Sequence, residues 1–97
     1  MNVAPTPTPA REAADAAVIA EAVRGLSPVV RSSVRRSAEA YATVKAVMGL
    51  EDNNSRVVAE VLVDVVRLNL DFPDVEMTDS LLMLRVGAEC RAIDRGL

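Results

Sequence analysis

The sequence predicts an all-α fold, a small, mostly up-and-down bundle of four helices preceded by an extended arm rich in proline and threonine. Two observations predict it. Apolar and charged residues recur at helical spacing along most of the 97-residue chain. Cap-forming residues and prolines divide the chain into segments of helix length. We expect the arm to cover residues 1–9 and a single helical domain to cover residues 10–97.

The arm is expected to be extended because prolines alternate with threonines there, and proline disfavours a helix interior. Thr8 has a side-chain oxygen of the kind that caps helices, and Pro9 suits a first helical position. A helix should therefore run from about Pro9 to Arg24, with Gly25 at its end. Its apolar face consists of Ala16, Ile19, Val23 and Leu26.

A second helix should begin almost at once, because Ser27 and Pro28 repeat the same pairing of cap and start. We expect it to run to about Met48, with Gly49 ending it. Along it, one set of residues steps alternately by four and three positions. This spacing is typical of a seam that packs on another helix at a shallow angle. The set is Val30, Val34, Ser37, Tyr41, Val44 and Met48.

The most apolar segment, from Ser55 to Asp71, predicts a third helix. Its charged residues step by four, four, three and four positions, whereas a strand would place charges on both of its faces. They are Arg56, Glu60, Asp64, Arg67 and Asp71. A helix with a single narrow charged stripe must be covered on several sides. We therefore expect it at the centre of the core, or of a core that another chain completes.

A last helix should run from about Asp79 to Arg95, with Thr78 as its cap and Gly96 after its end. It carries two nearly opposite apolar faces, which need two things to pack against. The first face consists of Leu82, Val86, Cys90 and Ile93. The second consists of Leu81, Leu84, Ala88 and Ala92.

Self-association is the use that we predict for the second face of the last helix, through Leu81, Leu84 and Ala88. Hydrophobic residues make up 51% of the chain, which is more than one small core readily hides. We therefore expect a homo-oligomer or an obligate complex. Gly87, between the two faces, would permit the close approach of another backbone.

The connection before the last helix contains two further candidate contacts, Phe72 and Met77. Apolar side chains are less expected in a long loop than in a helix. Either the connection folds back onto the bundle, which is the interpretation we favour, or it presents these two side chains to a partner.

One basic concentration interrupts a chain whose net charge is −3. Arg31, Arg35 and Arg36 lie within two turns of the second helix, where they could bind an acidic protein partner or phosphates. The overall charge argues against a general affinity for nucleic acid. Alternatively the arginines form a solvated face or pair with Glu21 and Glu39. As exposed residues, Arg31 and Arg35 should tolerate reversal of their charges to Glu without loss of the fold.

The sequence contains few of the residues and motifs on which enzyme catalysis commonly depends. There is no histidine, which removes the commonest general base and the usual zinc ligand. The single cysteine, Cys90, permits no intramolecular disulfide and is expected to be a buried apolar residue. The glycines are isolated, so no phosphate loop is formed. We expect no catalytic, cofactor-binding or metal-binding residues, no cofactor and no enzymatic activity.

The function that the sequence favours is therefore a non-catalytic protein–protein interaction. The chain would be an assembly, adaptor or inhibitor component that acts through helix surfaces and oligomerisation. The alternative is a DNA-binding transcriptional regulator that uses the face of Arg31, Arg35 and Arg36. No charge-free run is long enough to span a membrane. We expect a cytoplasmic protein of a bacterium or phage host, or a component of a large assembly.

Overall fold

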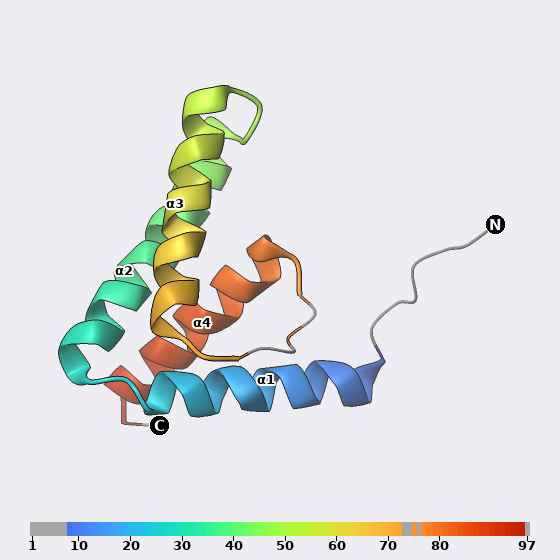
Figure 1. Ribbon diagram of the computed structural model, residues 1–97, viewed down its shortest axis with the longest axis vertical. Helices are drawn as coiled ribbons and strands as arrows, with labels where there is room; N and C mark the ends of the chain where they lie inside the picture. The colour runs from blue at the N-terminus through green and yellow to red at the C-terminus, as the bar shows by residue number, and fades with distance from the viewer. Residues whose placement is uncertain (1–7, 73–74, 76, 97) are drawn as a thin grey trace.

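The computed structural model describes residues 8–72, 75 and 77–96, and these residues form four α-helices and no strand (Figure 1). The all-α, four-helix prediction is confirmed. The helices are α1 (Pro9–Arg24), α2 (Pro28–Thr43), α3 (Asn53–Asn69) and α4 (Asp79–Asp94), and a π-helical turn, η1 (Val44–Met48), extends α2. The arm falls mostly on residues 1–7, which lie outside the described residues.

Each helix begins where a short polar side chain can cap it. Thr8, Ser27, Asp52 and Thr78 precede the four helices, and each side chain accepts a hydrogen bond from the amide of the third helical residue. The predicted starts of α1, α2 and α4 are confirmed. Helix α3 begins two residues earlier than expected, because Asp52 is the cap and Ser55 already lies in the first turn.

The arrangement in space places α2 between two neighbours. Helices α2 and α3 run side by side in opposite directions, α4 packs obliquely on α2, and α1 crosses the end of the bundle and packs on α4 (Figure 1). Helix α3 touches α4 only slightly. Within this chain the centre of the bundle is therefore α2, and the prediction that the third helix would hold that place is wrong.

The core draws on all four helices and on the connection before α4. Its apolar members are Ile19, Val23, Val34, Ala38, Tyr41, Ala59, Val63, Val66, Leu70, Phe72, Leu82, Met83, Val86 and Cys90. Phe72 is only 8% exposed, and Met77 packs against the core from the connection. At Phe72 and Met77 the connection thus folds back onto the bundle, as we favoured, and Phe72 has little surface left for a partner.

Helix α3 buries only one of its faces. Ala59, Val63 and Val66 face the core, whereas Val57 and Val61 are more than half exposed. The end of the second helix also emerges from the core, since Met48, expected in its seam, is 61% exposed. No helix among the described residues is long and apolar enough to cross a membrane.

Candidate functional site

The outer face of α4 remains uncovered by the rest of the described chain. Leu81 is 54% and Leu84 is 64% exposed, while Ala88 is half-buried. These residues are the expected second face of the last helix. The first face is buried at Leu82 and Val86, which are at most 1% exposed. Large apolar side chains at the surface are costly in water, so this face is a candidate binding surface.

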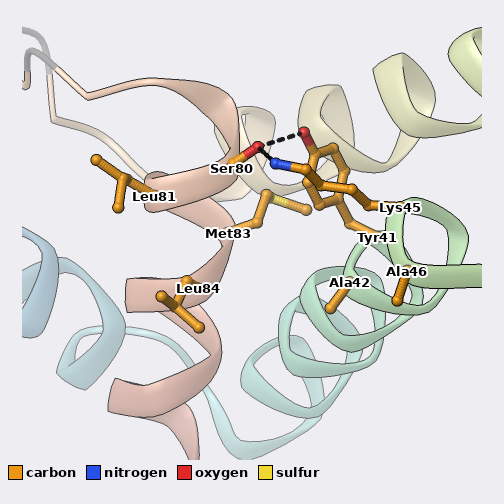
Figure 2. Close-up of a pocket in the computed structure, with 8 residues that line it drawn as sticks. All are labelled: Tyr41, Ala42, Lys45, Ala46, Ser80, Leu81, Met83 and Leu84. Carbon is orange, nitrogen blue, oxygen red and sulfur yellow. Dashed lines mark hydrogen bonds between the residues drawn. The ribbon is translucent and has the colours of Figure 1, made fainter. Parts of the chain in front are cut away.

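A groove of about 310 Å³ lies beside this face, between the end of the second helix and the first turns of α4 (Figure 2). It is lined by Tyr41, Ala42, Lys45, Ala46, Ser80, Leu81, Met83 and Leu84. The two alanines leave the space that larger side chains would fill, and the leucines and Met83 form an apolar wall opposite them. A groove of this volume and lining can accommodate an apolar side chain.

One corner of the groove is polar. Lys45 donates a hydrogen bond from Nζ to Oγ of Ser80, and the Tyr41 hydroxyl lies 3.3 Å from the same oxygen, at hydrogen-bond distance (Figure 2). Tyr41 and Lys45 stand four residues apart on the second helix, so they share one side of it. Tyr41 is 5% exposed and held by the core. The groove therefore combines an apolar wall with a positioned ammonium group.

The charge of Lys45 is not neutralised within the described part of the chain. The ion pairs there join other residues, and no described carboxylate lies within 4.0 Å of Nζ. Among the described residues that line the groove, Lys45 is also the only charged one. A ligand that places a carboxylate at this corner would gain an ion pair without displacing an existing one.

The contact between Ser80 and Lys45 also raises the question of nucleophilic chemistry. A serine beside a lysine can act as a nucleophile when the lysine serves as its base, which requires desolvation of the amine. The Lys45 side chain is exposed to water. The Ser80–Lys45 pair is therefore better suited to binding than to nucleophilic catalysis. Separately, no group of three metal-ligating side chains forms among the described residues.

Two of the three arginines in the basic concentration on α2 already have partners within the chain. Arg35 Nη1 lies 2.7 Å from Oδ2 of Asp94, and Arg31 Nε lies 3.8 Å from Oδ1 of the same carboxylate. Arg31 also donates from Nη1 to the carbonyl oxygen of Leu26 at 3.1 Å. These two arginines thus join α2 to the end of α4. Less of their side-chain surface is available to a partner than the sequence suggested.

The expected pairing of this face with Glu21 and Glu39 does not occur. Glu21 instead binds Arg24 of its own helix at 3.0 Å, and Glu39 lies 3.5 Å from Arg91 of α4. Arg36 is exposed, and it is the member of the basic concentration that remains at the surface.

Comparison with protein-family models, with curated proteins and with solved structures finds no match.

Sequence reasoning named Leu81, Leu84 and Ala88 but missed the groove beside them. A local signal did exist, because Tyr41 and Lys45 are the only tyrosine and lysine of the chain and stand one helical turn apart. Their meeting with Ser80, 35 residues beyond Lys45, depends on the packing of α2 against α4. Nothing in the local sequence predicts that packing.

Proposed function

We propose that this chain is a non-catalytic protein–protein interaction protein whose groove between α2 and α4 binds a helical segment of a partner. It would serve as an assembly, adaptor or inhibitor component. The observation that carries the proposal is the combination of exposed Leu81 and Leu84 with an apolar groove and the unneutralised ammonium of Lys45. Buried apolar anchors supply much of the affinity of such interfaces.

The chemistry of the groove favours an amphipathic helix that carries a carboxylate. Such a helix would insert an apolar side chain between Ala42 and Leu84 and place Asp or Glu beside Lys45. Lys45 is positioned for this contact by its hydrogen bond to Ser80. A basic segment would meet like charge at that corner, which makes the groove selective.

The alternative of a DNA-binding regulator has less support. Arg31 and Arg35 would have to leave Asp94 before they could contact phosphate, and that exchange costs part of the gain. Only Arg36 of that face is exposed.

The test selects peptides from a random library of displayed helices against the full chain. We expect the enriched peptides to combine leucine-like residues with Asp or Glu. Leu84→Glu and Lys45→Glu should each weaken binding of the best peptide about tenfold or more in fluorescence polarisation. Leu68→Glu is the matched control, because Leu68 is 86% exposed on α3, and it should bind the peptide unchanged.

Circular dichroism of each variant separates lost binding from lost folding. Failure of the selection to enrich any peptide would contradict the proposal. Enrichment of peptides without acidic residues, or binding that both groove variants leave intact, would contradict it as well.

A further inference from the structure

Helix α3 carries a second apolar surface, which we call the outer seam and which consists of Val58, Val61, Val65 and Leu68. Val58 is 47%, Val61 54% and Leu68 86% exposed, and Val65 is half-buried. The residues step by three, four and three positions, so they share one side of the helix. That side points away from the core, which α3 contacts through a different set of residues.

The pattern of the outer seam suits the packing of one helix against another. Steps of three and four place Val58 and Val65 at one heptad position and Val61 and Leu68 at the other. The residue one step before the seam is Asn54, so the apolar surface ends there.

We propose that the outer seam is the contact between two copies of this chain, with α3 of one copy packed on α3 of the other. The seam contains apolar side chains of similar size and no charge, so it complements itself and selects no charged partner. A two-fold dimer needs such a surface, because the same patch serves both subunits.

The charges beside the seam permit this pairing. The part of the charged stripe that lies within α3 consists of Arg56, Glu60, Asp64 and Arg67, whose charges sum to zero, and Asp71 lies beyond the end of the helix. Two copies can therefore approach through α3 without net repulsion, even though each chain has a net charge of −3.

The extent of the seam sets the expected strength of the dimer. Eleven residues of helix span about 16 Å, whereas a stable interface of standard size buries about 800 Å² on each partner. One short seam supplies part of that area. We therefore expect subunits that exchange, with a dissociation constant in the micromolar range.

This assignment gives the two proposed binding surfaces different partners. Self-association, which the sequence suggested for Leu81, Leu84 and Ala88, is assigned to α3. The groove beside α4 is concave and needs a convex partner, so it stays available for another protein. A dimer built in this way would present two grooves and bind a bivalent partner more tightly than a monomer does.

Sedimentation equilibrium of the full chain tests the proposal from micromolar to millimolar concentration. The average mass should rise from that of one chain, 10.3 kDa, toward that of two. Val61→Lys should remain at the mass of one chain, because it buries an unpaired charge in the seam. Leu84→Lys is the matched control, with the same new charge on α4, and should dimerise as the unmutated chain does.

Val61 lies outside the core, so its replacement should leave the circular dichroism spectrum unchanged. If Val61→Lys unfolds, Leu68→Lys takes its place in the same measurement. A one-chain mass for the unmutated protein at every concentration would overturn the proposal. So would a dimer that survives Val61→Lys, or one that Leu84→Lys abolishes.

The measurement is independent of the groove. Val61→Lys should bind the peptide selected on the groove with unchanged affinity, so the failure of either proposal leaves the other testable on its own.

Discussion

Arg35 of α2 donates a hydrogen bond from Nη1 to Oδ2 of Asp94 in α4 across 2.7 Å, and the other oxygen of that carboxylate faces Arg31. One carboxylate thus lies between two arginines that stand one turn apart on the neighbouring helix. The face that the sequence offered as a partner site contributes to the joint between α2 and α4. Reversal of both arginine charges would place three carboxylates together, so we no longer expect the fold to tolerate it.

Removal of the carboxylate in Asp94→Ala should lower the free energy of unfolding by about 1 kcal/mol, because it leaves two arginines side by side without their counter-ion. The arginine side chains are 16% and 33% exposed and that of Asp94 is 38% exposed, so solvent screens the interaction in part. Urea unfolding at low and high salt measures it, and the loss should shrink as salt rises.

The control is Glu21→Ala, which removes the ion pair between Glu21 and Arg24. Those side chains are 80% and 60% exposed, and the stability should hardly change. Equal losses in the two variants would show that the contact with Asp94 is an ordinary surface pair.

Gly87 of α4 faces Ala38 of α2 and leaves room for one methyl group. A Cβ atom there would lie 3.6 Å from the Ala38 Cβ and 3.4 Å from Nη1 of Arg91, which is close to ordinary contact. Gly87→Ala should therefore stabilise the protein by up to about 1 kcal/mol through helix propensity. Gly87→Leu should destabilise it by about 1–3 kcal/mol through overpacking.

Thermal unfolding of the two variants decides the matter. A loss of stability in Gly87→Ala would mean that α2 and α4 approach each other more closely than ordinary contact allows.

The starts of the helices could be predicted because capping is a local interaction. Thr8, Ser27 and Thr78 each bond an amide three residues ahead, so the sequence contains both partners. The π-helical turn at residues 44–48 was not predicted, since no residue there marks it. Local chemistry thus determines where a helix begins better than how its last turn winds.

The central helix could not be predicted in the same way. The apolar content of α3 predicts that much of its surface must be buried, but it does not predict which element buries it. In the structure α2 covers one face, while Val61 and Leu68 stay exposed. The other half of the sequence-based expectation, that another chain completes the core, is what the proposed dimer would fulfil.

In the candidate site, too, features within one helix could be predicted and features that depend on tertiary packing could not. Leu81 and Leu84 could be named because both lie on one helix whose opposite face is also apolar. The groove depends on Ala42 and Lys45 meeting Ser80 across two helices, and that meeting is a result of tertiary packing.

Acid should weaken the cap of α3. Asp52 accepts hydrogen bonds from the amide and the hydroxyl of Ser55 at 2.8 and 2.9 Å, and these bonds lower the pKa of Asp52 below its ordinary 3.8. Because the folded state favours the ionised carboxylate, its stabilising contribution is present above pH 3.8 and is lost as the pH falls through the lowered pKa.

Urea unfolding of the unmutated chain and of Asp52→Asn, from neutral pH to below pH 3.8, measures how much the Asp52 charge contributes to stability. The unmutated chain should be the more stable of the two near neutral pH, and the difference should shrink below pH 3.8. Asparagine still caps a helix but does not titrate, so it isolates the charge. A difference that stays constant across the range would rule out Asp52 as its source.

Cys90 should be unreactive as long as the protein is folded. Its side chain is 0% exposed, and burial, followed by the nearby carboxylate of Asp94, raises the pKa of the thiol. The thiolate is the reactive form, so both its scarcity and its position in the core slow attack by a disulfide reagent. We expect labelling of the native chain to be slow and to accelerate sharply in urea.

A matched surface thiol provides the control for this last prediction. In a Cys90→Ala background, Val29→Cys places a cysteine at a position of α2 that is 80% exposed and lies outside the outer seam, and it should label fast with or without urea. Cys90→Ala itself should cost about 1 kcal/mol of stability, because it removes one buried sulfur. Cys90→Ser should cost more, since it buries a hydroxyl among apolar residues. Native labelling of Cys90 as fast as that of the surface thiol would place Cys90 outside a closed core and remove its assignment as a buried structural residue.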